Sequence, residues 1–132
     1  MKRALKALAW TMPACLAGFW LFLLLLPSDV VKSRYATLQA ARDDRLFERG
    51  WLPDILPPSS RDIRTAHHLD LNAASGDFRF TPEEYPWLLA MTKPAVRNGR
   101  EVRAVSQDSD TWIFDCNGDE GRCSYENERQ RP

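Results

Sequence analysis

A run of twenty uncharged residues near the start of the chain limits what this sequence can fold into. Residues 7–26 contain no charged side chain, and only Thr11 and Pro13 interrupt their apolar character. In a helix, twenty residues extend over about 30 Å, which is the thickness of the hydrocarbon core of a bilayer. A helix in a domain this small cannot be buried on every face. The run therefore predicts a transmembrane anchor at residues 7–26.

A secretory signal peptide is the alternative to an uncleaved anchor. The basic start of the chain, with Lys2, Arg3 and Lys6, and the apolar run that follows it fit both. Residues 27–31 contain no pair of small residues at the spacing of a cleavage site. The sequence therefore favours the uncleaved anchor, and the mass of the mature chain would decide between the two.

The placement of charge predicts the orientation of this anchor. All basic residues of the first 26 precede the apolar run. The first charged residue after the run is Asp29, and residues 27–132 carry 15 basic and 18 acidic residues. Positive residues beside a span favour the cytoplasmic side. We therefore predict a single-pass inner-membrane protein with a cytoplasmic N-terminus at residues 1–6 and a periplasmic C-terminal domain. The net charge of −3 outside the anchor argues against a nucleic-acid partner.

Two of the three cysteines predict a disulfide. Cys116 and Cys123 flank a segment that contains Asn117-Gly118 and Gly121, which is typical of a turn. A disulfide between them is compatible with an oxidising compartment. The alternatives are two free thiols in a cytosolic domain, or a zinc site, for which the chain has only two further, remote histidines.

Two helices are expected after the anchor. Residues 27–49 predict a stalk helix, because Ser28 can cap its N-terminus and Gly50 suits the position after its C-terminus. Apolar residues of this segment fall near one helical face, namely Val31, Tyr35, Leu38 and Leu46. A second, short helix is predicted over residues 81–91, because its first residues, Thr-Pro-Glu-Glu, fit a capping box.

Several short segments alternate apolar and polar residues, which predicts strands. These segments are residues 63–71, 78–80, 101–106, 111–116 and 122–126. Three prolines predict an extended connector over residues 51–58, docked on the core by its apolar side chains. Short hairpin connections favour an antiparallel sheet with helices on one face. We therefore predict an α+β domain over residues 50–126, followed by a flexible tail at residues 127–132.

One acidic pattern resembles a calcium-binding loop. Asp115, Asn117 and Asp119 have the spacing of the first ligands of an EF-hand, and Glu126 stands at the position of its last ligand. The sixth position of such a loop is normally Gly, but here it is Glu120. These four ligand candidates make calcium the one cofactor that the sequence suggests, and the alternative is a polar hairpin turn.

A second candidate site lies near the two histidines. His67 and His68 are neighbours in a predicted strand, so their side chains point to opposite faces and cannot easily bind one metal together. His68 can instead join Asp70 and Asn72 across the following turn, in a small ligand or cation loop. The alternative is that both histidines are ordinary core or surface residues.

The same part of the chain resembles a group of known proteins. Its residues are Gly50-Trp51-Leu52-Pro53, Leu56-Pro57-Pro58-Ser59-Ser60, Asp62-Ile63 and His68-Leu69-Asp70-Leu71-Asn72. This stretch resembles a pattern in uncharacterised, membrane-anchored bacterial proteins. The resemblance implies a bacterial envelope setting and no assigned activity.

No motif in the sequence predicts an enzyme. There is no Gly-x-Ser-x-Gly elbow, and the two cysteines of the domain are expected to be bonded to each other. The sequence therefore favours a non-enzymatic interaction module whose periplasmic domain contacts another envelope protein. The alternative is a periplasmic module that binds a cation or small ligand, and an enzyme with an unrecognised site is a third hypothesis.

Overall fold

The protein is described by a computed structural model at residues 15–26 and 29–129. A helix occupies residues 15–24, and the backbone N–H of Leu25 donates to the carbonyl oxygen of Leu21 at 3.1 Å. Among the described residues, no helix is both long and apolar enough to cross a membrane. The predicted anchor at residues 7–26 lies partly outside the described residues, and the predicted cytoplasmic segment lies wholly outside them.

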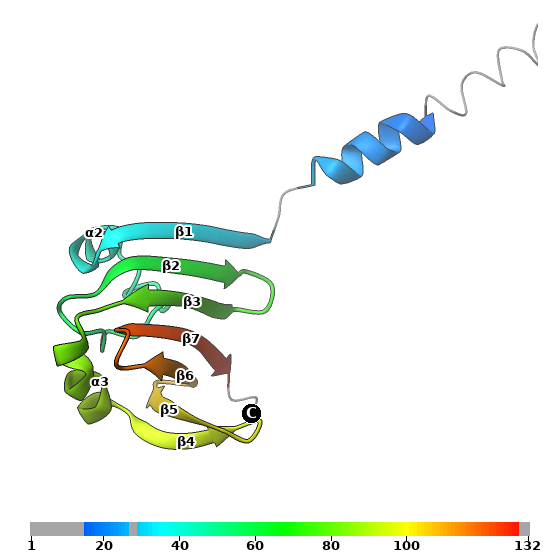
Figure 1. The fold of residues 1–132 in the computed structure, drawn as a ribbon. Coiled ribbons are helices and arrows are strands. Elements are labelled where there is room, and N and C mark those ends of the chain that lie inside the picture. Colours follow the sequence, from blue (N-terminus) through cyan, green and yellow to red (C-terminus); the bar gives the residue numbers. More distant parts are fainter. Residues whose placement is uncertain (1–14, 27–28, 130–132) are drawn as a thin grey trace, which may run out of the picture.

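The described residues form a seven-stranded sheet in the order β1-β2-β3-β7-β6-β5-β4 (Figure 1). Each strand is antiparallel to its neighbours. The last strand of the chain therefore lies in the middle of the sheet and joins its first three strands to the other three. The bounds are β1 Val30–Thr37, β2 Arg61–His68, β3 Ala73–Arg79, β4 Lys93–Arg97, β5 Arg100–Gln107, β6 Asp110–Asn117 and β7 Arg122–Arg129.

The helices that accompany the sheet are short. They are α2 (Leu38–Asp43), the 3₁₀ turn η1 (Pro82–Glu84) and α3 (Tyr85–Met91). The predicted antiparallel sheet and short helix are confirmed, but strands outweigh helices, so the domain is mostly β. Two strands were not predicted, because β4 contains Pro94 and β1 lies within the segment predicted as a stalk helix.

The predicted stalk helix at residues 27–49 is wrong. Val30–Thr37 is a strand, in which Tyr35 lies opposite Ile63 and Ser33 opposite Thr65. The spacing of four between Val31 and Tyr35 puts both residues on one face of a helix and also on one face of a strand. Pairing with β2 decides between the two, and helix remains only in α2, where the hydroxyl of Thr37 accepts a hydrogen bond from the N–H of Ala40 at 3.2 Å.

The predicted helix over residues 81–91 is present as η1 and α3, but the capping box does not form. Thr81 makes no side-chain cap, and the Glu84 carboxylate accepts instead from the backbone N–H of Ser59 at 2.9 Å. The hydroxyl of Ser59 in turn accepts from the N–H of Thr81 at 2.8 Å. These two hydrogen bonds therefore hold the start of η1 against Ser59, which lies just before β2.

The predicted flexible tail is also wrong in part, because residues 127–129 belong to β7. The side chain of Asn127 is buried, and its Oδ1 accepts a hydrogen bond from the N–H of Ala74 at 2.6 Å. This bond spans β3 and β7, so the end of the strand is held to the sheet interior.

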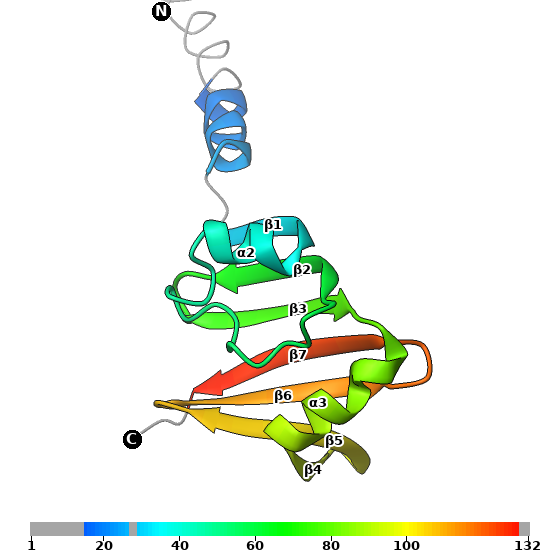
Figure 2. The ribbon, with the colours of Figure 1, turned by 90° about the vertical axis from the view of Figure 1, so that its left-hand side faces the viewer.

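The core lies on one face of the sheet, under α2, the segment that joins α2 to β2, and α3 (Figure 2). The predicted connector at residues 51–58 is docked on it, since Leu52 and Leu56 are buried. The largest fully buried apolar side chains come from both layers: Phe78, Phe80, Phe114, Leu46, Leu52, Ile63 and Leu88. Burial of these residues on one side leaves the opposite face of the sheet open to solvent.

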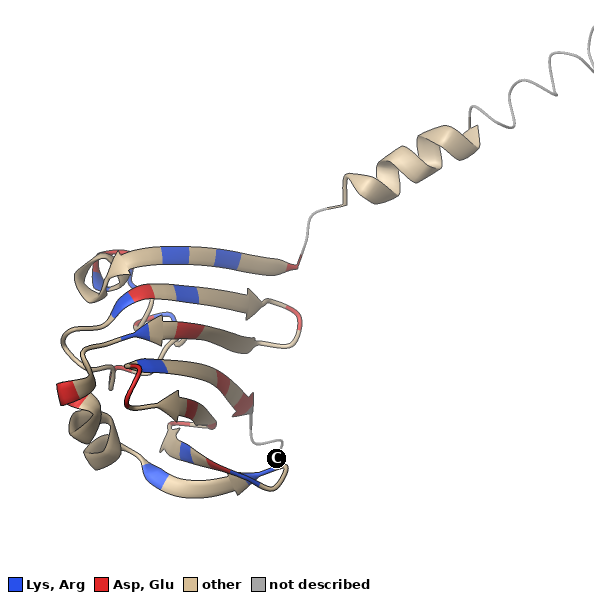
Figure 3. Ribbon diagram, in the orientation of Figure 1, with Lys and Arg blue, Asp and Glu red and all other residues tan. Residues whose placement is uncertain are grey.

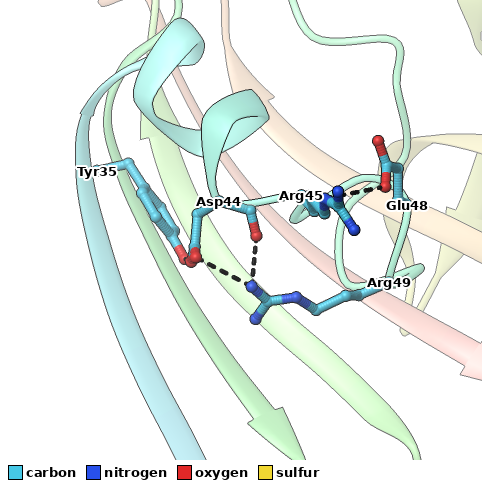
Figure 4. A network of polar contacts seen from close by, with 5 residues as sticks. All are labelled: Tyr35, Asp44, Arg45, Glu48 and Arg49. Atoms are coloured by element: carbon cyan, nitrogen blue, oxygen red, sulfur yellow. Dashed lines mark hydrogen bonds and ion pairs between the residues drawn. The ribbon is translucent and has the colours of Figure 1, made fainter.

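A polar network fastens the residues after α2 to β1 (Figure 4). The hydroxyl of Tyr35 donates to the Asp44 carboxylate at 2.5 Å, and Arg49 Nη2 lies 3.0 Å from the other oxygen of Asp44. The bond from Tyr35 lowers the pKa of the Asp44 carboxyl, and burial raises the pKa of the Tyr35 hydroxyl. Arg49 also lies over the ring of Trp51, with its guanidinium 5.0 Å from the ring centroid.

Candidate functional site

The predicted disulfide between Cys116 and Cys123 is present. The two residues lie opposite each other in β6 and β7, at the end of the hairpin next to its turn. The two cysteines are close in sequence and belong to one hairpin, so this disulfide could be predicted without knowledge of the rest of the fold.

The four predicted calcium ligands do not form a ligand set. The carboxylate of Asp115 pairs with Arg100 at 3.0 Å, and Asn117 Oδ1 accepts from the N–H of Glu120 at 3.2 Å within the turn. Asp119 is exposed in that turn, and Glu126 pairs with Arg97. In the part of the chain that the structure describes, no group of three or more His, Cys, Asp and Glu residues is placed to hold a metal ion.

The hairpin explains this separation of the four residues. Glu126 lies opposite Ile113, whereas Asp115 lies opposite Ser124, so Glu126 is displaced along β7 away from the turn. An EF-hand loop instead wraps around one point and brings its last ligand back to the first. The polar turn, the alternative interpretation of this pattern, describes the geometry.

The residues of the second predicted site also serve the fold. His67 is buried and stacks on Trp51 with 4.5 Å between ring centroids, whereas His68 is half-buried on the opposite face at the end of β2. Asn72 has a positive φ of 46°, and its N–H donates to the carbonyl of Leu69 at 3.3 Å, which closes the β2–β3 turn. Among the described residues, no side-chain hydrogen bond or ion pair joins His68, Asp70 and Asn72.

The open face of the sheet carries a group of arginines that the sequence does not single out. Figure 3 marks basic positions along the neighbouring strands β1, β2, β3 and β7. One arginine from each of these strands lines a common hollow: Arg34, Arg64, Arg79 and Arg122. Cross-strand pairing sets Arg34 opposite Arg64, and Arg79 opposite Arg122. We call these four residues the arginine cluster.

Two aspartates lie among these arginines. Asp62 has a positive φ of 49° and sits where the register between β2 and β3 shifts, and its carboxylate lies 3.5 Å from Arg34 Nη2. Asp77 lies opposite Arg64. Together the six side chains line a hollow of about 260 Å³. Four positive and two negative charges give this hollow a net charge of +2, in a chain whose total formal charge is zero.

Three of the four arginines of the cluster have no ion-pair partner among the described residues. Among the described residues, no ion pair or side-chain hydrogen bond engages the guanidinium groups of Arg64, Arg79 and Arg122. All three side chains are exposed. They are therefore available to an external group with negative charge.

A larger hollow of about 660 Å³ continues the same face toward β5 and β6. Both hollows are lined by Asp77 and Arg122, so they form one polar surface. The other two arginines of the larger hollow are already paired, since Arg100 pairs with Asp115 at 3.0 Å and Arg97 with Glu128 at 2.7 Å. The uncompensated charge therefore lies at the arginine cluster.

A family model of the YbbD head domain matches residues 29–79. The chain is similar to that domain over β1, α2, β2 and β3, which carry three of the four arginines of the cluster, whereas β7 and Arg122 lie outside the matched residues. No curated protein and no solved structure matches the chain. The resemblance noted within residues 50–72 stays a prediction.

Proposed function

We propose that this protein is a single-pass, inner-membrane-anchored interaction module whose periplasmic domain binds an acidic region of another envelope protein through the arginine cluster. The observation that carries this proposal is the group of three exposed, unpaired arginines on the open face of the sheet. The apolar run at residues 7–26 supports the anchor, and the disulfide supports an oxidising compartment.

The chemistry of the cluster favours carboxylates as its partners. A guanidinium group presents a planar fork of N–H donors that matches a carboxylate in a bidentate way. Arginine is also enriched in protein–protein interfaces, where it often contributes strongly to affinity. Aspartate and glutamate side chains of a partner can therefore satisfy Arg64, Arg79 and Arg122.

The extent of the cluster favours a protein over a small anion. Its arginines lie on four adjacent strands, and neighbouring strands are about 4.8 Å apart, so the cluster extends over about 14 Å. Several carboxylates of a partner surface match a row of this length better than one small anion does. Asp62 and Asp77, which lie among the arginines, disfavour a uniformly negative polymer.

Charge reversal tests this function. Arg64→Glu and Arg122→Glu each place a negative charge in the cluster, whereas Arg45→Glu makes the same change in net charge at an exposed residue after α2. We expect a partner crosslinked to the full chain in native membranes to be lost with the first two variants and retained with the third. Retention by all three, or no crosslinked partner with the unmodified chain, would contradict the proposal.

A further inference from the structure

The turn between β2 and β3 exposes two leucines. Leu69 is 53% exposed and Leu71 is 71% exposed, although the core beneath the sheet takes up other leucines completely. The turn is short and closed by the hydrogen bond between Asn72 and Leu69. Two large apolar side chains at the tip of a tight turn, outside any core, are typical of a contact surface.

This turn is fixed beside the start of β1. Val30 lies opposite His68, and the N–H of Leu69 donates to the carbonyl oxygen of Asp29 at 2.9 Å. The turn and the start of β1 accordingly lie at the same end of the sheet (Figure 1). Any structure that constrains the position of Asp29 therefore also constrains Leu69 and Leu71.

The predicted anchor supplies such a constraint. Asp29 follows Leu26, the last residue of the apolar run, by three positions, and three extended residues reach at most about 11 Å. Each headgroup layer of a bilayer is about 5–8 Å thick. An anchor at residues 7–26 thus holds Asp29, and with it the turn, within or directly above the headgroup layer.

We infer that Leu69 and Leu71 insert into the membrane interface and form a second contact between the domain and the bilayer. We choose the lipid surface as the partner of this turn because only three positions separate Asp29 from the end of the predicted anchor, which brings the turn close to the bilayer. Asp70 lies between the two leucines and is exposed, and its carboxylate can stay in the hydrated headgroup layer. The inference rests on the anchor in the proposed function.

This contact would also orient the proposed binding surface. Arg79 stands at the opposite end of β3 from the turn, six residues from Ala73, which is about 20 Å along a strand. Arg122 lies opposite Arg79, so it is equally far from the turn. Insertion of the turn therefore leaves Arg79 and Arg122 far from the lipid and accessible to a periplasmic protein.

A spin label tests the position of the turn. In the full chain with Cys15→Ser, Leu71→Cys is labelled with a nitroxide and the protein is placed in phosphatidylcholine bilayers. Glu83→Cys, at an exposed residue of η1, is the matched control. We expect the label at residue 71 to be more accessible to oxygen than to a water-soluble nickel chelate, and the label at residue 83 to show the reverse.

Alkaline carbonate extraction separates this inference from the proposed function. If the chain stays in the membrane but the label at residue 71 is as accessible to the nickel chelate as the label at residue 83, the inference is wrong and the anchor remains. If carbonate releases the chain, the anchor is wrong and the inference falls with it.

Discussion

At the scale of single residues, His67 is a titratable side chain buried on the core-facing side of the sheet. His67 lies on the packed side of β2, as Thr65 does, and its ring stacks on Trp51. Its Nδ1 is buried without a hydrogen-bond partner among the described residues. Burial is the first cause that lowers the pKa of His67, and the nearby His68 is the second. The fold therefore favours the neutral imidazole.

This preference predicts that the domain loses stability in mild acid. Between the lowered pKa of folded His67 and the ordinary value near 6.5, the unfolded chain binds more protons than the folded chain. The free energy of unfolding should therefore fall as the pH drops below about 6.5, by at most about 1.4 kcal/mol per pH unit. Urea denaturation at pH 7.5 and 5.5 measures this change.

Two variants test whether this loss of stability in mild acid comes from the imidazole of His67. His67→Phe can keep a stack on Trp51 without a titrating group, so it should show a smaller loss between the two pH values than the unmodified domain. His68→Gln, on the opposite and partly exposed face, should keep most of the loss. Equal losses in all three proteins would contradict the assignment.

At the scale of elements, the β6–β7 hairpin shows how a local turn is built into the sheet. The N–H of Phe80, just after β3, donates to the carbonyl oxygen of Gly121 at 2.8 Å. Gly121 has a φ of +61°, and a Cβ atom at this position would lie 2.1 Å from the carbonyl oxygen of Phe80. The turn thus needs glycine both for its backbone conformation and for its approach to the end of β3.

Gly121→Ala should therefore destabilise the domain more than a substitution at another left-handed glycine. Gly99 in the β4–β5 turn has a φ of +74°, but a Cβ there meets nothing within 4 Å. Gly99→Ala should lower the free energy of unfolding by about 1–2 kcal/mol for the backbone conformation alone. Gly121→Ala should cost more, because backbone atoms must also move. Urea unfolding of both variants gives the comparison, and equal losses would show that the contact with Phe80 is unimportant.

At the scale of the whole molecule, the central position of β7 makes the two halves of the sheet depend on each other. The ring of Phe78 in β3 packs against Tyr125 of β7 and Phe114 of β6, with centroid separations of 6.3 and 6.4 Å. Without β7, the edge of β3 would be unpaired and Phe78 would lose its contact with Tyr125. The segment similar to the YbbD head domain therefore contributes only part of the core of this protein.

We accordingly expect a fragment of residues 29–79 not to fold by itself. It would keep β1, α2, β2 and β3 but lose the strand that covers β3, and a domain of about fifty residues has little apolar surface to bury. Circular dichroism and urea unfolding should show no cooperative transition for this fragment and a single transition for residues 29–129. A cooperative transition of the short fragment would contradict this view of the core.

The sequence by itself determined the features that depend on neighbours along the chain. The β6–β7 hairpin and its disulfide follow from turn residues placed between Cys116 and Cys123. The docked connector at residues 51–58 and the helix near residues 81–91 follow from prolines, apolar side chains and helix-start residues that act within a few positions. Local conformational preference is sufficient for these elements.

Only the tertiary structure decided the features that depend on partners far along the chain. Val31 and Tyr35 fit a helix or a strand equally well, and β2 selects the strand by pairing with it. The arginine cluster exists because β7 returns to lie beside β3, which brings Arg122 next to Arg79 across 42 intervening residues. Strand order is set by the packing of the whole core and not by local preference, so neither the true first strand nor the cluster could be predicted from residue spacing.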